Sequence, residues 1–160
     1  MGAPSSRDSL QYFLLRPSSL PPSKESADAA GYDLHADFGG DELSPSKQDL
    51  VIPPGERAFI GTGVVVMLTA GTFGRVAPRS GLPLEIDVLG GLIDPRYRGE
   101  VKIIVVNNGD NAFTIRQGDR VAQLILDEIL DLNSVRVLSI GGTPRGPSAS
   151  GGRGRLFLGF

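Results

Sequence analysis

The sequence alternates between short runs rich in Val, Ile and Phe and turns rich in Gly, Pro, Asn and Asp, a spacing that leaves little room for long helices. The 160 residues include 22 Gly and 12 Pro, well above the roughly 12% that these two residues reach together in average proteins. Short strands in close succession are typical of an all-β sandwich or barrel. The expected strands are Tyr12–Arg16, Arg57–Gly61, Val64–Leu68, Phe73–Ala77, Val101–Asn107, Ala112–Arg116, Arg120–Leu126 and Ser134–Leu138.

The remaining segments define the domain plan. We expect residues 1–142 to form one β core, with residues 1–9 disordered and a single short helix at Leu82–Leu89. The nearly continuous apolar run Val101–Val106 predicts a strand buried on both faces. Residues 143–160 are rich in Gly and Arg and contain no acidic residue, which is typical of a flexible C-terminal arm.

Composition removes several kinds of chemistry. The absence of Cys excludes disulfides, a thiolate nucleophile and Cys-ligated metals, and the single His35 excludes a multi-histidine metal centre. A Ser-His-Asp triad would need His35, yet no G-x-S-x-G turn is present. A net charge of −2 gives no general attraction to nucleic acid. No apolar run is long enough for a membrane span, and no secretory signal is visible. We therefore expect an intracellular protein, cytoplasmic or nuclear.

Two glycine-containing turns carry side chains suited to anions and metals. In Ala30-Gly31-Tyr32-Asp33-Leu34, the Asp33 carboxylate could hold a metal-bound water or simply bond to its own turn. In Pro78-Arg79-Ser80-Gly81-Leu82, backbone N–H groups, the Arg79 fork and the Ser80 hydroxyl could bind phosphate. A structural turn with a surface ion pair is the alternative for the second segment.

Two further segments carry a candidate base and an unusual amide. Within Gly90–Val101, Asp94 follows apolar residues and precedes Pro95, a setting that can hold a partly desolvated general base. Tyr97 could offer its ring to a sugar or a base, although an Asp-Pro turn with a core tyrosine is the structural alternative. In Gly118–Ile125, Gln123 lies inside an apolar strand and needs a partner. Asp119 and Arg120 could form an ion pair.

These four motifs, in this order and spacing, resemble those of the trimeric dUTPases over roughly residues 30–126. The resemblance implies a distorted jelly roll of the β-clip type that assembles as a homotrimer with three shared active sites. It implies hydrolysis of dUTP to dUMP and pyrophosphate with Mg²⁺, and no role for nucleic acid or membranes.

The resemblance also implies a role for individual residues. Asp94 matches the general base that activates the attacking water, and Tyr97 matches the residue under the deoxyribose that disfavours a 2′-hydroxyl. Asp33 matches a carboxylate that acts through water near the metal, with no direct protein ligand to Mg²⁺. Uracil-reading positions correspond to Gly91, Leu92, Ile93 and Lys102, and phosphate contacts to Arg79, Ser80, Gly81 and Gln123.

The C-terminal arm departs from the family pattern. The fifth family motif reads approximately R-G-x-G-G-F-G-S-T-G, and here Arg145-Gly146 matches its start. Arg153 stands where the uracil-stacking phenylalanine belongs, and Arg153, Phe157 or Phe160 could take its place. The Ser-Thr pair is missing. Arg96 also replaces an acidic residue found in many relatives.

Two alternative functions follow from the same resemblance. A dCTP deaminase of this fold relies on a glutamate about ten residues beyond the aspartate, where this chain has Ile104, which cannot move protons. The altered arm suggests a second alternative, a catalytically weak or silent binding or regulatory protein with the dUTPase fold.

Overall fold

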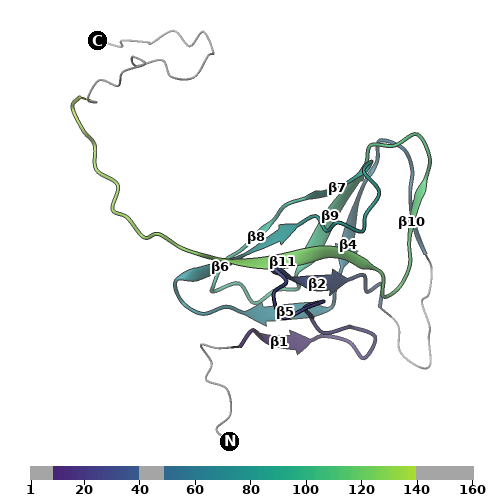
Figure 1. The fold of residues 1–160 in the computed structure, drawn as a ribbon, viewed down its shortest axis with the longest axis horizontal. Helices are drawn as coiled ribbons and strands as arrows, with labels where there is room; N and C mark the ends of the chain where they lie inside the picture. Colours follow the sequence, from purple (N-terminus) through teal and green to yellow (C-terminus); the bar gives the residue numbers. More distant parts are fainter. Residues whose placement is uncertain (1–8, 40–48, 140–160) are drawn as a thin grey trace, which may run out of the picture. The chain divides into compact units, whose positions relative to one another are not determined.

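The structure, a computed structural model, describes residues 9–39 and 49–139, and all the regular elements in these ranges are antiparallel β-strands (Figure 1). These ranges contain no helix. The strands are β1 (Gln11–Leu14), β2 (Gly31–His35), β3 (Leu50–Ile52), β4 (Arg57–Gly61), β5 (Val64–Met67), β6 (Thr72–Ala77), β7 (Ile86–Leu89), β8 (Leu92–Ile93), β9 (Lys102–Asn107), β10 (Phe113–Ile115) and β11 (Arg120–Glu128).

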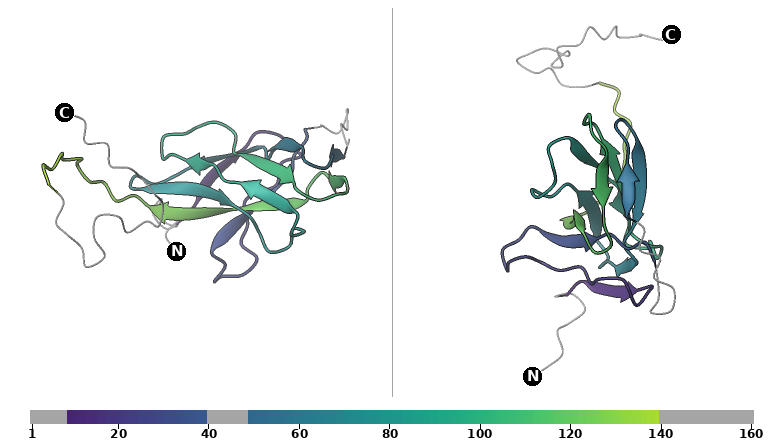
Figure 2. Two further views of the ribbon diagram at one scale, coloured as in Figure 1. Left: turned by 90° about the horizontal axis from the view of Figure 1, so that it is seen from above. Right: turned by 90° about the vertical axis from the view of Figure 1, so that its right-hand side faces the viewer.

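The strands pair into two larger sheets and two ribbons. One sheet has the order β2-β11-β6-β8 and the other β4-β9-β7, while β1 pairs with β5 and β10 with β3. Every one of these pairings is antiparallel, and most join strands distant in sequence. The long strand β11 therefore lies between β2 and β6 in the four-stranded sheet (Figure 2). The all-β expectation is confirmed.

A single apolar core joins these layers. Its fully buried members include Ile60 of β4, Val66 of β5, Ile103 and Val105 of β9, and Leu124 of β11. They come from alternate positions of their strands, because successive side chains of a strand point to opposite faces. On β9, Ile104 and Val106 on the other face are only half-buried, so the expectation that both faces are fully buried is wrong.

Two expected elements are absent from the described residues. The predicted helix at Leu82–Leu89 is wrong, because Ile86 and Val88 are buried at a spacing of two and pair with β9 as part of β7. The predicted strand at Ser134–Leu138 is also wrong. Residues 131–139 form no regular structure, and all of them are exposed, so no neighbouring strand in the described ranges supports the apolar alternation there.

The chain divides into two compact units, residues 1–130 and 131–160. All the strands named above belong to the first unit. Of the second unit the structure describes residues 131–139 only, so Arg145 and Arg153 lie outside the described residues. None of the described segments forms a helix of the length and hydropathy needed to span a bilayer.

Candidate functional site

The first group of candidate residues gathers where β2, β11 and β6 run side by side. Gln123 of β11 lies opposite Asp33 on β2 and Ala77 on β6, and the Arg79 turn follows Ala77 directly. Asp33 accepts a hydrogen bond from Nε of Arg79 at 3.3 Å and another from Nη1 of Arg120 at 3.3 Å. Its carboxylate is therefore held by two guanidinium groups and does not simply bond to its own turn.

Gln123 has the hydrogen-bond partner that a polar side chain in an apolar strand needs. Its Nε2 donates to the carbonyl oxygen of Pro78 at 2.7 Å, which ties β11 to the turn before Arg79. Gly31 on β2 leaves space for this side chain, since a Cβ there would lie 2.6 Å from Oε1 of Gln123. Gly31 of the first motif thus leaves the space that the Gln123 side chain of the fourth motif occupies.

The turn Pro78–Leu82 carries the guanidinium of Arg79, whose side chain is only 14% exposed, and the exposed hydroxyl of Ser80. Leu82 N donates to the Arg79 carbonyl at 3.3 Å, and Ser80 is exposed. A Cβ on Gly81 would lie 2.5 Å from Nη1 of Arg79, so the guanidinium packs directly over the glycine. Charge-assisted donors held in this way are suited to phosphate oxygens.

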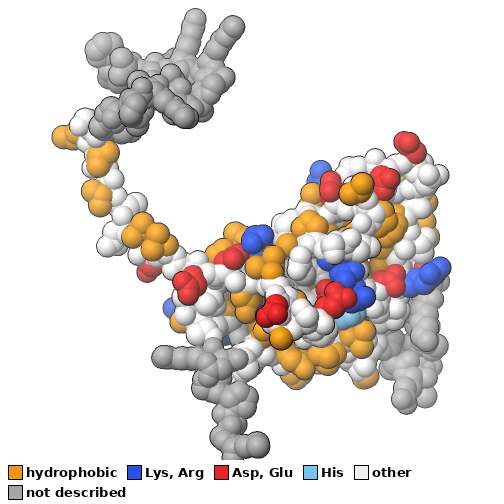
Figure 3. Space-filling view, in the orientation of Figure 1, with side chains coloured by type: hydrophobic (Ala, Val, Ile, Leu, Met, Phe, Trp, Pro, Cys, Tyr) orange, Lys and Arg blue, Asp and Glu red, His pale blue; other side chains and the backbone are white. Residues whose placement is uncertain are grey.

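His35 borders this group, and Figure 3 shows blue and red side chains gathered beside the pale-blue histidine. Its Nδ1 is buried and has no hydrogen-bond partner among the described residues. Burial lowers the pKa of His35; Asp33 opposes that change, whereas Arg120 and Arg79 add to it. The imidazole is therefore neutral at pH 7, and the two arginines give the group its positive charge.

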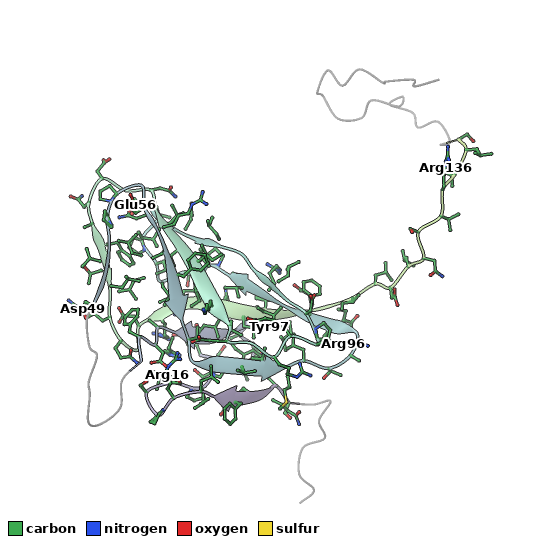
Figure 4. All side chains as sticks on the ribbon, turned by 180° about the vertical axis from the view of Figure 1, so that it is seen from behind. Arg16, Asp49, Glu56, Arg96, Tyr97 and Arg136 are labelled. Carbon is green, nitrogen blue, oxygen red and sulfur yellow. The ribbon has the colours of Figure 1, made fainter. Side chains whose placement is uncertain are left out.

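The second group of candidates lies at the end of the β7–β9 hairpin, on the loop between β8 and β9. Tyr97 N donates to the Asp94 carbonyl at 3.0 Å, and the Tyr97 hydroxyl donates to the Glu100 carbonyl at 3.0 Å. Arg98 Nη1 donates to the carbonyls of Pro95 and Tyr97 at 2.7 and 2.8 Å. The loop is ordered mainly by its own hydrogen bonds, and Figure 4 labels Arg96 and Tyr97 on it.

Asp94 and Tyr97 are open to solvent. Asp94 is exposed and Tyr97 is 43% exposed. The expected partial desolvation of Asp94 is therefore wrong for a single chain, because no other described element covers this side chain. Tyr97 is equally not a core tyrosine. Around them, Gly91 accepts from Val76 N, Leu92 is exposed, Ile93 is buried, and Lys102 is exposed at the start of β9.

The two groups lie toward opposite ends of β6. Ile93, just before Asp94, pairs with Gly74, while Arg79 lies five residues beyond Gly74. Between these points β6 runs only from Gly74 to Ala77, and Arg79 lies in the turn beyond its end. Asp94 and Arg79 share no hydrogen bond or ion pair among the described residues.

Some contacts differ from those that the sequence indicates. Asp119 does not pair with Arg120; its Oδ2 accepts from Arg116 N at 2.8 Å, whereas Arg120 contacts Asp33 and lies 3.6 Å from Glu25. Arg120 is not among the predicted site residues, because pairing across two strands leaves no local sequence signal. Among the described residues, no three His, Cys, Asp or Glu side chains form a metal-binding group.

Comparison of the sequence with known proteins points to one family. The dUTPase family model matches residues 18–153. The deoxyuridine 5′-triphosphate nucleotidohydrolase of fowl adenovirus A is 40% identical over 147 residues, covering 91% of this chain and 77% of the relative. The enzyme of the same name from Candida albicans is 37% identical over 154 residues, covering 94% and 91%.

Solved structures show the same fold. The dUTPase of Staphylococcus bacteriophage 80alpha with dUpNHpp superposes with a TM-score of 0.76 at 24% identity, covering 90% of this chain and 99% of that one. A mutant dUTPase from phage phi11 of S. aureus, studied for the coordination of a structural Mg(II) ion, gives a TM-score of 0.70 at 24% identity, covering 82% and 97%. With the family model spanning most of its length, this chain belongs to the dUTPase family.

Proposed function

We propose that this protein hydrolyses dUTP to dUMP and pyrophosphate, as a homotrimer whose active sites are shared between copies. The observation that carries this proposal is the division of the candidate residues into two groups. The phosphate-binding residues lie around Arg79, and the hairpin carries Asp94. Because no contact joins these two groups within the described residues of one chain, we propose that a complete site combines the hairpin of one copy with the phosphate-binding residues of another. The relatives that share the nucleotidohydrolase name support the substrate.

On the hairpin, Asp94 acts as the general base. Its exposed carboxylate can accept the proton of a water that attacks the α-phosphorus, once a second copy covers the loop. The Tyr97 ring lies under the deoxyribose, and the backbone of Gly91–Ile93 reads uracil together with the region of Lys102. Backbone donors and acceptors suit this task because they are fixed by strand pairing.

Among the phosphate-binding residues, Arg79 and the Ser80 hydroxyl bind phosphate oxygens at the Gly81 turn. Asp33 orients Arg79 through its Nε, leaving the outer edge of the guanidinium for the ligand. Gln123 completes this group from β11. The C-terminal arm supplies Arg145 as a further phosphate contact, and Arg153, Phe157 or Phe160 takes the place of the ring that stacks on uracil.

The residues of this chain fit a Mg²⁺ ion that arrives with the triphosphate. The oxygens of Asp33 each accept from an arginine, so this carboxylate is suited to a contact through water and not to direct ligation. Mg²⁺ keeps several waters and is commonly bound through substrate phosphates. When bound, it neutralises the charge that develops on the phosphates.

Pyrophosphate release from dUTP, UTP, dTTP and dCTP, measured in parallel with Mg²⁺, tests the proposal. We expect release from dUTP alone. Ammonia release from dCTP would instead identify a deaminase. A folded protein that binds dUTP but releases no pyrophosphate would identify the silent binding or regulatory protein that the altered arm suggests, and would overturn the proposal.

A further inference from the structure

A buried charge network lies outside both candidate groups and ends at the hairpin. Arg16, which follows β1, donates from Nε to Oδ2 of Asp37 at 2.9 Å and from Nη2 to Oε1 of Glu100 at 2.6 Å. One guanidinium therefore joins two carboxylates that come from segments 63 residues apart in sequence. Glu100 is the second-last residue of the loop that carries Asp94 and Tyr97.

The Asp37 side of this network is a fixed anchor. Its carboxylate is 1% exposed and also accepts from the hydroxyls of Ser18 at 2.8 Å and Ser19 at 2.6 Å, and from Gln117 Nε2 at 3.1 Å. Burial raises the pKa of Asp37, but these hydrogen bonds hold it well below its usual range. A permanently charged, fully hydrogen-bonded carboxylate keeps Arg16 in one position.

The Glu100 side fixes the end of the hairpin. Its Oε1 also accepts from Gly63 N at 2.8 Å, and the next residue, Val101, accepts from the Thr62 hydroxyl at 2.6 Å. The exit of the hairpin is thus bound to the turn between β4 and β5. A Cβ on Gly61 would lie 2.9 Å from the same Oε1, so the carboxylate fits closely against this turn.

The same residue holds the tyrosine. The hydroxyl of Tyr97 donates to the backbone carbonyl of Glu100, and Gly99 between them leaves the ring its place. A Cβ on Gly99 would lie 2.4 Å from that hydroxyl, so the ring packs directly over the glycine. Any shift of the Glu100 backbone therefore moves the acceptor that orients the Tyr97 ring.

We infer that Arg16 and Glu100 are positioning residues that set the Tyr97 ring and thereby the discrimination between deoxyribose and ribose. This inference rests on the proposed function, in which Tyr97 lies under the sugar. Its chemistry demands arginine at position 16, since only a planar fork donates to two carboxylates in fixed directions. A lysine at this position would keep the positive charge but would not donate to Asp37 and Glu100 in these two fixed directions.

Steady-state kinetics with dUTP and UTP test the inference, using Arg16→Lys and Glu100→Gln. We expect the ratio of kcat/KM for dUTP to that for UTP to fall at least about tenfold in both variants, corresponding to roughly 1.4 kcal/mol. We expect kcat for dUTP to change less than this ratio. A merely structural role would lower the thermal midpoint without changing the ratio.

Asp127→Asn is the matched control. Asp127 accepts from Nε of Arg75 at 3.0 Å, an ion pair between β6 and β11 that shares no hydrogen bond with Arg16, Tyr97 or Glu100 among the described residues. We expect this variant to keep the dUTP-to-UTP ratio of the wild type. A loss of discrimination in the control equal to that in Glu100→Gln would show that any lost ion pair has this effect, and would overturn the inference.

Hydrogen exchange of the amides of residues 94–101 separates this inference from the proposed function. We expect faster exchange in Arg16→Lys and Glu100→Gln than in the wild type or Asp127→Asn. This measurement needs no turnover, so a wild type that hydrolyses nothing overturns the proposed function while the positioning role is still tested. Unchanged exchange together with an unchanged ratio in both folded variants would overturn the positioning role.

Discussion

The phosphate-binding residues around Arg79 and the hairpin loop around Asp94 are ordered by different means. Among the phosphate-binding residues, side chains from two neighbouring strands and from the turn after β6 hold one another, with Asp33 between Arg79 and Arg120. In the hairpin, Asp94 to Gly99 are ordered by hydrogen bonds within the loop, and the loop is anchored at its ends. The first group is therefore preorganised for a ligand by the fold of one chain. The second presents Asp94 to solvent, and in the proposed homotrimer another copy would cover it.

The largest effect expected from this division is on Asp94. Asp94→Asn should lower kcat for dUTP by roughly 10²–10⁴-fold, the usual contribution of a general base. Its thermal midpoint should stay close to that of the wild type, because the side chain is exposed. Asp110→Asn, another exposed aspartate on the β9–β10 connection, should leave both quantities unchanged. Pyrophosphate release and thermal unfolding measure the pair.

Mixed trimers sharpen the same prediction. Co-expression of Asp94→Asn with Arg79→Gln should restore about a quarter of the sites if each site takes its two groups from different copies. Either variant alone should remain nearly inactive. If both groups had to come from the same copy, every mixed site would lack one residue, and no activity would return. That result would contradict the sharing of sites.

The two regions also show what the sequence can and cannot predict. Strand β4 has the expected bounds, and β11 begins at the expected residue, in a run rich in Val, Ile and Leu, and extends two residues beyond the expected end. Strand β2 is not predicted, because Gly31-Tyr32-Asp33 has the composition of a turn and forms a strand only through pairing with β11. The motifs indicate Asp33, Arg79 and Gln123, and the structure brings these three together.

Long-range polar contacts are beyond the reach of sequence patterns. Arg120 bonds to Asp33 across 87 residues and Arg16 to Glu100 across 84, so no local spacing indicates either pair. Their formation depends on which strands become neighbours, which periodicity alone does not determine. The separation of Asp94 from Arg79 has the same origin, since it follows from the register of β8 on β6.

A smaller effect is expected from the glycine of the phosphate turn. Gly81→Ala would place a Cβ 2.5 Å from Nη1 of Arg79 and so displace the guanidinium. We expect kcat/KM for dUTP to fall about tenfold, because one charge-assisted hydrogen bond contributes roughly 1.5–3 kcal/mol. Stability should change little, since a flexible side chain can move away. Pro83→Ala, in the next exposed position of this loop, should leave kcat/KM unchanged; an unchanged value in Gly81→Ala would remove the Arg79 position from phosphate binding.

The smallest expected effect is on how stability depends on pH. It distinguishes the two regions once more, because the chain's single histidine lies beside the phosphate-binding residues. Burial lowers the pKa of His35 below the value of about 6.5 that an unfolded chain would show. Below that pH the unfolded state binds more protons than the folded state, so the free energy of unfolding must fall as pH decreases, by at most about 1.4 kcal/mol per pH unit for one proton. His35→Gln should lose this component between pH 7 and 5, as measured by urea unfolding across that range. If the free energy of unfolding changed with pH equally in the wild type and the variant, His35 would titrate alike in the folded and unfolded protein. Its buried Nδ1 would then have no effect on how stability near Arg79 depends on pH.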